Sequence, residues 1–345
     1  MKAAALEKYT VRDVLEYRGH PQLHRSVDSA SDIESALALM NRHDIVSVPV
    51  FDAASESFVD IVSVYDIRDY IVRTAGLEDE VAHQLLSGRP SGKHTVLQGA
   101  VAQVVQSRKH ASPAISAGAP LADLLRLFTT QRHHRVLVSG VDPRHLDAVQ
   151  AAEVPTGSRK RGFSVDSGCS AASFGDDESG GRAAVCGLTQ YDVVRFIQHH
   201  NHELGRALDA PVAAVARTHS ATKDGPLQCL TVRDTALAAL RLLRDTHCSA
   251  LPVVDADGRL VTEVAGASLR RLSSGTLGLL GRPVLAYMFG LQLPVEGPYV
   301  VHDGFSVGQV MAGLLWTNCR RAWLVDRDER PVAVVSLTDI LAHFM

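Results

Sequence analysis

The sequence lacks the features of a secreted or membrane-spanning protein. No signal-peptide pattern is present, and the most apolar stretch, residues 276–295, is interrupted by charge, prolines and glycines, whereas a bilayer span needs about 20 apolar residues. The cysteines are odd in number and have no paired spacing, which predicts free thiols in a reducing compartment: Cys169, Cys186, Cys229, Cys248 and Cys319. We therefore expect no membrane contact and a cytoplasmic location, with a nuclear one also compatible.

Catalytic and metal-binding motifs are also missing. There is no nucleophile elbow, zincin helix or Gly-x-Gly-x-x-Gly run. The segment Ser87–Thr95 resembles a phosphate loop, but it is one residue short between its glycines and has His94 where Ser or Thr would hold magnesium, so we interpret residues 76–113 as a linker. Three histidines within His199–His202 lack cysteine or carboxylate partners and indicate a polar helix end. We expect no enzyme, no metal and no cofactor.

Charge and length set wider limits. The formal net charge of −3 over 345 residues argues against a nucleic-acid scaffold, although a local basic surface remains compatible with it. Nearly half of the residues are apolar (46%), which is enough for two cores of ordinary domain size.

A repeated pattern dominates the rest of the chain. Two short apolar runs separated by a polar turn lead directly into a helix-start signal, which indicates strand, turn, strand and helix. The second runs of the four copies end at Val62-Ser-Val-Tyr-Asp66, Leu188-Thr-Gln-Tyr-Asp192, Val264-Ala-Gly-Ala-Ser268 and Val335-Ser-Leu-Thr-Asp339. An amphipathic helix is predicted before each copy, over Ile33–Arg42, Leu121–Gln131, Ala236–Arg244 and Val307–Trp316. The predicted fold is α/β (α+β), with four units of strand, helix, strand, strand and helix.

These units resemble the cystathionine-β-synthase (CBS) motif. Four in a row are similar to the two tandem pairs, or Bateman modules, of the gamma regulatory subunit of AMP-activated protein kinase. The resemblance is carried by Ser249-Ala-Leu-Pro-Val-Val-Asp255, Val335-Ser-Leu-Thr-Asp339-Ile-Leu and His134-Arg135. It implies two modules that form a flattened disk. The expected bounds are 8–204 for the first module, with repeats at 8–75 and 108–203, and 205–345 for the second, with repeats at 208–275 and 282–345.

A hydroxyl at a strand end and a carboxylate at the next helix start recur in three repeats, as Ser63 with Asp66, Thr189 with Asp192, and Ser336 with Asp339. A carboxylate can accept both hydroxyls of a ribose diol, and the resemblance implies this role. The alternative is helix capping, which would stabilise the helix through its dipole. For Asp339 we expect Thr338 as the N-cap. In the third repeat Ser268 replaces the carboxylate, and a lone serine cannot hold a diol in this way.

Basic residues at the turns before the middle strands are candidate phosphate ligands. By resemblance, His134 and Arg135 are the strongest, since arginine offers forked donors. Further candidates are Arg244, His247, Arg320 and Arg321. Solvated helix ends explain such cations equally well. Adenine is expected in an apolar slot formed by strand backbone and by Val48, Val64, Val138 and Val335.

An insertion at residues 140–182 separates the two halves of the second repeat. It is rich in Gly, Ser and acidic residues, and it cannot bury enough apolar surface to fold alone, so we predict disorder. Basic residues precede Ser164, which makes phosphorylation there a hypothesis.

The resemblance implies a non-catalytic, energy-sensing regulator that binds AMP, ADP or ATP. Its expected partners are protein kinase catalytic and scaffold subunits, and the pattern leaves room for a homodimer. No nucleic acid is expected. The alternative is a CBS-repeat adaptor or phosphatase-pathway regulator that docks proteins without physiological nucleotide binding. The missing carboxylate in the third repeat and the insertion favour that alternative, whereas the three aspartates and His134-Arg135 oppose it.

Overall fold

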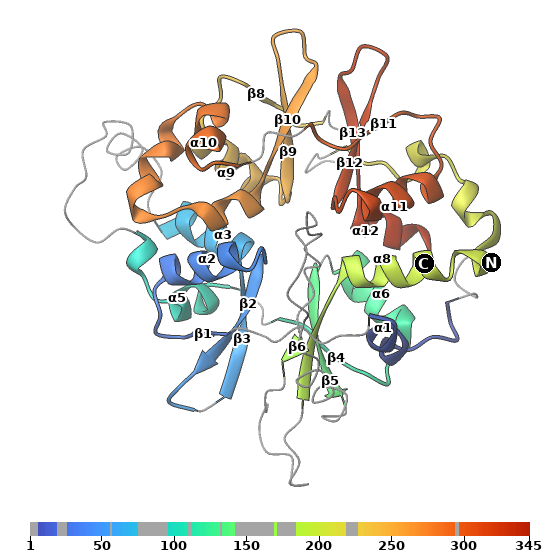
Figure 1. Ribbon diagram of the computed structural model, residues 1–345, viewed down its shortest axis with the longest axis horizontal. Coiled ribbons are helices and arrows are strands. Elements are labelled where there is room, and N and C mark those ends of the chain that lie inside the picture. The colour runs from blue at the N-terminus through green and yellow to red at the C-terminus, as the bar shows by residue number, and fades with distance from the viewer. Residues whose placement is uncertain are drawn as a thin grey trace, which may run out of the picture.

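The computed structural model describes residues 6–18, 26–55, 57–74, 96–108, 112–131, 133–141, 169–170, 184–218, 227–293 and 297–345. The chain forms four repeats around a common centre, one in each quadrant of Figure 1. Each repeat contributes its own small sheet, in which a short first strand pairs in parallel with the middle strand and the middle strand pairs antiparallel with the last. The predicted four-unit α/β fold is thereby confirmed.

The first repeat shows how the sequence encodes the unit. Its elements are β1 (Val27–Asp28), α2 (Ile33–Arg42), β2 (Ser47–Asp52), β3 (Ser57–Ser63) and α3 (Val64–Thr74). Helix α2 begins after Asp32, whose carboxylate accepts the N–H of Ser35 at 2.7 Å and satisfies an otherwise unpaired donor. The apolar spacing of α2 buries Ile33, Ala36, Leu37 and Met40 on one face, which is why its predicted bounds are confirmed.

The other repeats follow the same order. The second has β4 (Ala114–Ser116), α6 (Leu121–Thr129), β5 (Arg135–Val141), β7 (Ala184–Thr189) and α8 (Gln190–His199). The third has β8 (Leu230–Thr231), α9 (Ala236–Asp245), β9 (Ala250–Val254), β10 (Leu260–Ala265) and the 3-10 helix η5 (Gly266–Arg271). The fourth has β11 (Val300–Val301), α11 (Val307–Trp316), β12 (Arg321–Val325), β13 (Pro331–Ser336) and α12 (Leu337–His343).

Two local predictions are wrong. Helix α12 begins after Ser336 and not after Thr338, because Ser336 and Asp339 form a capping box in which each side chain satisfies a backbone N–H of the other. The third repeat ends in a 3-10 helix and not in an α-helix, and Gly266 opens it. A Cβ at Gly266 would lie 3.1 Å from the ring of Tyr65, so glycine permits this close contact between the first and third repeats.

The segment that precedes each repeat packs on a neighbouring repeat. The residues before the first repeat, α1 (Val11–Arg18), contact the second repeat, although the predicted bounds of 8–75 include them in the first. The residues before the second repeat, in the predicted linker, form the 3-10 helix η1 (Val96–Gln98) and α5 (Val101–Gln106), which contact the first repeat. The third and fourth repeats exchange η4 (Val212–Ala214) and α10 (Val284–Gly290) in the same way. The backbone bonds are Val11 N–H to Ala119 O (2.9 Å), Val101 N–H to Ser31 O (2.8 Å), Val212 N–H to Phe305 O (2.8 Å) and Val284 N–H to Asp234 O (2.8 Å).

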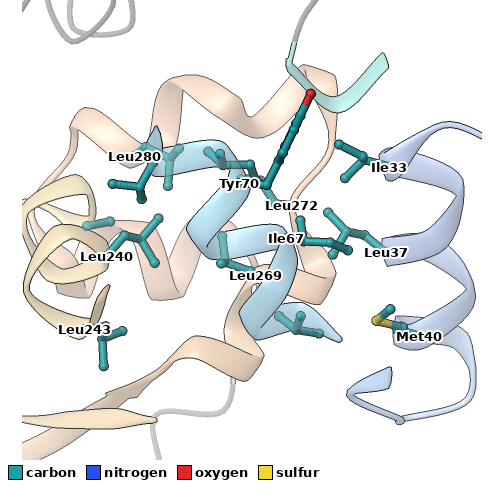
Figure 2. Packing of buried hydrophobic residues seen from close by; sticks show 14 of the residues in the cluster. Ile33, Leu37, Met40, Ile67, Tyr70, Leu240, Leu243, Leu269, Leu272 and Leu280 are labelled. Atoms are coloured by element: carbon teal, nitrogen blue, oxygen red, sulfur yellow. The ribbon is translucent and has the colours of Figure 1, made fainter. Parts of the chain in front are cut away.

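Packing between helices joins the first repeat to the third and the second to the fourth. One hydrophobic core combines the first and third repeats, and a second core combines the second and fourth. Figure 2 shows the former, with Ile67 and Tyr70 of α3 between the α2 side chains and Leu240 and Leu243 of α9. A smaller cluster of Ala250, Trp323 and Val334 joins the sheets of the third and fourth repeats. Each repeat therefore contacts two neighbours, and the predicted module bounds at residues 204 and 205 stay a prediction.

Several predictions fall on residues that the structure does not describe. These are the phosphate-loop-like segment Ser87–Thr95, the Ser164 phosphorylation site and most of the 140–182 insertion. Within that insertion, Gly140 and Val141 belong to β5, and β6 (Cys169–Ser170) pairs antiparallel with β7, so the predicted disorder is wrong for these four residues. Among the described helices, none is long and apolar enough to cross a membrane.

Candidate functional site

A cavity of 890 Å³ lies where the four repeats meet. Its lining includes the ends of the last strands and the starts of the following helices, which is where the sequence pattern places its polar residues. Among its titratable side chains, basic ones outnumber acidic ones: Arg73, Arg108, His133, His134, Arg135, Arg217, Arg244, His247, Arg320 and Arg321. Among the described residues, two carboxylates belong to the same lining, those of Asp66 and Asp69. The cavity is therefore suited to an anionic ligand.

All three predicted ribose carboxylates cap helices. Asp66 Oδ2 accepts the N–H and hydroxyl of Ser63 at 2.8 and 2.6 Å. The same pair of bonds joins Asp192 Oδ2 to Thr189, at 2.9 and 2.7 Å, and Asp339 Oδ2 to Ser336, at 2.8 and 2.5 Å. The capping alternative is thus present in each repeat. Each cap uses the carboxylate oxygen Oδ2. What else each aspartate can bind therefore depends on the surroundings of its other oxygen, Oδ1.

The three Oδ1 atoms have different surroundings. Asp66 lines the cavity, and none of the hydrogen bonds from the described residues reaches its Oδ1. Asp192 is only 2% exposed and is not in the lining, and its buried Oδ1 has no hydrogen-bond partner among the described residues. Asp339 is also buried, and its Oδ1 forms an ion pair with Arg217 Nε. Of these three aspartates, that of the first repeat lines the cavity and the other two do not.

Burial and a nearby arginine act in opposite directions on Asp66. Desolvation raises the pKa of Asp66 above its ordinary value, and this effect outweighs the lowering by Arg108 and Ser63. Arg108 Nη1 lies 3.5 Å from Asp66 Oδ2, while its Nη2 lies 2.5 Å from Asp60 Oδ2. Arg108 is thus shared between two carboxylates, with the shorter distance to Asp60.

Strand register explains where the cations lie. In the second and fourth repeats an arginine of the middle strand stands opposite the hydroxyl residue, as Arg135 opposite Thr189 and Arg321 opposite Ser336. The corresponding pairs are Ser47 with Ser63 in the first repeat and Ala250 with Ala265 in the third. At this register position, therefore, the second and fourth repeats contribute an arginine and the first and third do not.

His134 lines the cavity and is exposed there. Its Nδ1 lies 3.4 Å from Oε1 of Gln190, and its ring lies 6.0 Å from that of Tyr65, which joins the second repeat to the first. Enclosure by the surrounding protein lowers the pKa of His134, and the positive charges of Arg320 and Arg321 lower it further, although the Gln190 contact acts in the opposite direction.

Arg321 has a structural role. Its Nη1 lies 2.6 Å from Glu263 Oε1 and its Nη2 donates to Ser249 at 3.0 Å, while Trp323 Nε1 donates to the other oxygen of Glu263 at 2.7 Å. The side chain of Arg321 is 8% exposed. It lines the cavity, and both of its Nη atoms also take part in contacts that join the third and fourth repeats. Arg320 lines the same region.

The cations of the third repeat are placed by the end of α9. Arg244 lies against Asp245, with Nε and Nη2 each 2.8 Å from Oδ1, and its side chain is partly exposed. His247 adopts a positive φ of 52° just after the helix, a conformation typical of helix ends. Both residues line the cavity and both lie at a helix end, so their positions fit the predicted phosphate contact and the helix-end alternative equally well. Ser268, which replaces the carboxylate, lies 3.4 Å from the hydroxyl of Tyr287.

The predicted adenine slot is wrong for its side chains. Val48, Val64, Val138 and Val335 are fully buried in the two hydrophobic cores and do not line the cavity. The hydrophobic effect places these four valines, three in strands and Val64 at the start of α3, in the core, where each contributes about 1.5–3 kcal/mol. The apolar lining comes instead from Val46, Ile61, Pro113, Val334 and Leu337.

Sequence reasoning missed Arg217, Arg108 and Gln190. Arg108 follows α5 and Arg217 follows η4, two segments that lie outside the repeats. Aligning the four repeats with one another therefore does not show which site each arginine contacts. A signal was present: the spacing Val-x-x-Val-x-x-x-Arg occurs at Val11–Arg18 and again at Val101–Arg108. Gln190 Nε2 donates to the hydroxyl of Thr338 at 3.0 Å, a buried contact between the second and fourth repeats that the sequence does not indicate.

The polar helix end at His199–His202 packs on aromatic rings. His200 Nδ1 lies 2.9 Å from the carbonyl of Phe196, and its ring contacts those of Tyr9 and Phe196 at 4.8 and 4.4 Å between centroids. Among the described residues, no group of three or more His, Cys, Asp or Glu is arranged to hold a metal ion.

Comparison with known proteins agrees with this architecture. Residues 21–73 and 222–261 match the family model of the CBS domain. Among curated proteins, none matches the chain. Protein MJ1225 from Methanocaldococcus jannaschii, a proposed archaeal homologue of g-AMPK, is similar over 98% of this chain and 100% of its own, with 13% identity and a TM-score of 0.64.

Two further solved structures are less similar. An uncharacterised conserved protein from Pyrococcus horikoshii covers 98% of this chain and 100% of its own, with 14% identity and a TM-score of 0.49. The structure of CBSX2 in complex with AMP covers 39% of this chain and 94% of its own, with 24% identity and a TM-score of 0.30. Two segments of this chain match the CBS domain family, and the chain as a whole shares its four-repeat fold with protein MJ1225.

Proposed function

We propose that this chain is a non-catalytic regulatory protein that binds an adenine nucleotide, AMP, ADP or ATP, in its central cavity. The observation that supports this most is the combination of a cavity-lining carboxylate, Asp66, with basic side chains in excess of acidic ones in a single cavity. A nucleotide presents both a diol, which a carboxylate can accept, and phosphates, which cations attract. The volume of 890 Å³ lies within the range of about 300–1,000 Å³ found for small-molecule sites.

The proposed pose follows the distribution of charge. Ribose lies against Asp66 and Ser63, where Oδ1 of the carboxylate is left for a hydroxyl. Phosphates extend toward His134, Arg135 and Arg320 in the second and fourth repeats. The base lies near Val46 and the other apolar lining residues. Tyr65, which contacts His134, connects the two ends of this pose.

Regulation would follow from the contacts between repeats. A ligand that spans the first, second and fourth repeats favours the arrangement in which it makes all of its contacts, and it shifts an equilibrium only by that difference in affinity. The fold similarity to a proposed homologue of g-AMPK suggests a gamma-like, energy-sensing subunit of a protein kinase complex as the setting. Kinase catalytic and scaffold subunits are the partners we propose, in the cytoplasm.

A docking adaptor without physiological nucleotide binding is the second candidate. It is favoured by the burial of Asp192 and by the ion pairs that occupy Asp339 and Arg321. Pull-down of the full chain with kinase subunits and with phosphatase subunits, each with and without AMP, separates the candidates. Recovery of kinase subunits that changes with AMP supports the regulator, and recovery of phosphatase subunits that ignores AMP supports the adaptor.

Asp66→Asn tests the ribose contact. Hydrogen bonds to a charged acceptor contribute about 1.5–3 kcal/mol, so AMP binding should weaken about 10- to 100-fold in calorimetric titration. The matched control is Asp13→Asn, because Asp13 Oδ2 accepts the N–H and hydroxyl of Thr10 at 2.6 and 2.7 Å in the same type of cap but is not in the cavity lining. Equal AMP affinity in both variants would show that the ribose does not contact Asp66.

A further inference from the structure

The first and fourth repeats carry the same strand-to-helix motif but present different groups to the cavity. Ser63 with Asp66 and Ser336 with Asp339 form matching pairs of hydrogen bonds through Oδ2. Asp66 lines the cavity, whereas Asp339 does not, and Arg217 lines it at the fourth repeat. The side chain of Asp339 is 4% exposed and that of Arg217 is 45% exposed. A ligand at the fourth repeat therefore meets a guanidinium, where the sequence pattern predicts a carboxylate.

Arg217 is held in place from two sides. Its backbone N–H donates to the carbonyl of Val334, and its carbonyl accepts the N–H of Val334, each at 2.9 Å. Its Nε forms an ion pair with Asp339 Oδ1. Since Oδ2 of Asp339 already accepts from Ser336, protein donors occupy both carboxylate oxygens. At most one acceptor position remains, on a side chain that is 4% exposed and outside the cavity lining, so a ribose diol cannot place both hydroxyls there.

A single sequence difference explains why the first repeat has no close ion pair between its arginine and Asp66. Arg108 is the arginine that reaches Asp66, but its Nη2 is 2.5 Å from Asp60 and its Nη1 is 3.5 Å from Asp66. Asp60 precedes Asp66 by the same interval as Ala333 precedes Asp339. Alanine cannot compete for a guanidinium, so Arg217 stays on Asp339, while Asp60 draws Arg108 away from Asp66.

We propose that Arg217 determines specificity at the fourth repeat: it closes Asp339 to ribose and presents a cation that binds an anionic group, such as a phosphate of the ligand. This rests on the proposed function, since it names which part of a nucleotide each repeat takes. The Nη groups of an arginine whose Nε is already fixed retain the planar donors that match a phosphate. Ribose binds at the first repeat and not at the fourth.

Adenosine, which has a ribose but no phosphate, tests the closure. In calorimetric titration of the full chain, Arg217→Ala should bind one more equivalent of adenosine than the wild type. The double variant Arg217→Ala with Asp339→Ala should lose that equivalent again. Asp339→Ala alone should leave the wild-type adenosine stoichiometry unchanged, and this measurement stands even where Arg217→Ala fails to fold by circular dichroism.

Inorganic pyrophosphate tests the anionic arm, and its affinity should fall at least about tenfold in Arg217→Ala. Arg206→Ala is the matched control, since Arg206 is exposed on the same connecting segment and is not in the cavity lining; it should change neither titration. No gain of adenosine in Arg217→Ala, or loss of an equivalent in Asp339→Ala alone, would overturn the inference. A wild type that binds neither AMP nor adenosine refutes the proposed function, yet a gained equivalent in Arg217→Ala would still support the closure.

Discussion

Glu263 should be a stabilising link between the third and fourth repeats. Its two carboxylate oxygens lie on separate donors of β12, Arg321 Nη1 at 2.6 Å and Trp323 Nε1 at 2.7 Å. Trp323 is fully buried and belongs to the cluster that joins the two sheets. Replacing Glu263 by alanine leaves both donors without this acceptor, so the free energy of unfolding should fall.

The magnitude follows from the burial of each group. A buried indole N–H without an acceptor costs about 1–3 kcal/mol. Removing one partner of a buried ion pair costs about 3–5 kcal/mol, but Glu263 is 27% exposed and Arg321 keeps its bond to Ser249, so a smaller contribution applies. We expect Glu263→Ala to destabilise the protein by about 3 kcal/mol, and Glu263→Gln, which keeps one acceptor oxygen, by about 1–2 kcal/mol.

Urea denaturation followed by tryptophan fluorescence measures this loss. With a slope of about 3 kcal/mol/M, Glu263→Ala should lower the midpoint by about 1 M. Asp328→Ala is the control, because it removes an exposed ion pair with Arg330 (3.3 Å) that is worth at most about 1 kcal/mol. A midpoint for Glu263→Ala equal to that of the control would refute the reasoning. Arg321→Ala should behave like Glu263→Ala, which distinguishes a structural arginine from a phosphate ligand.

Two further predictions concern His134 and Gly313. Because the pKa of His134 is lowered, the unfolded chain takes up the proton more readily, so the ligand-free protein should lose stability as pH falls below about 6.5; a bound phosphate favours the charged ring, so AMP affinity should rise from pH 8 to 6.5. Calorimetry at several pH values checks this, and a slope that survives in His134→Gln would contradict it. Gly313→Ala would place a Cβ 1.9 Å from the hydroxyl of Tyr299 and should lower thermal stability by about 1–3 kcal/mol, whereas Gly304→Ala, with open space around it, should not.

The regular parts of the fold were predictable because their signals are local. Helices α2 and α11 have their predicted bounds, since apolar spacing and the caps Asp32 and Ser306 all lie within a few residues of each other. The exchange of α1 onto the second repeat was not predictable, because a short amphipathic segment does not encode which neighbour it will cover. The N-cap of α12 was ambiguous for a similar reason: Ser336 and Thr338 both carry hydroxyls, and Thr338 lies against Gln190 in the second repeat.

The candidate site was predictable in composition but not in accessibility. The sequence identifies Asp66, Asp192 and Asp339 as equivalent, and their matching caps show that they are equivalent locally. What separates them is the surrounding protein, above all Arg217, which is distant in sequence from Asp339. The predicted adenine slot was wrong because successive side chains of a strand point in opposite directions, either into the core or out of it, and Val48 points into the core.

The most direct test of the central claim is calorimetric titration of AMP into the full-length, nucleotide-stripped protein, shown to be folded and empty by mass spectrometry. The account predicts micromolar binding, about −8 kcal/mol, that ADP or ATP competes for, since Asp66 and the cations of the cavity act on one ligand. No heat and no competition with any of the three nucleotides would contradict it, and would leave protein docking as the function of the four repeats.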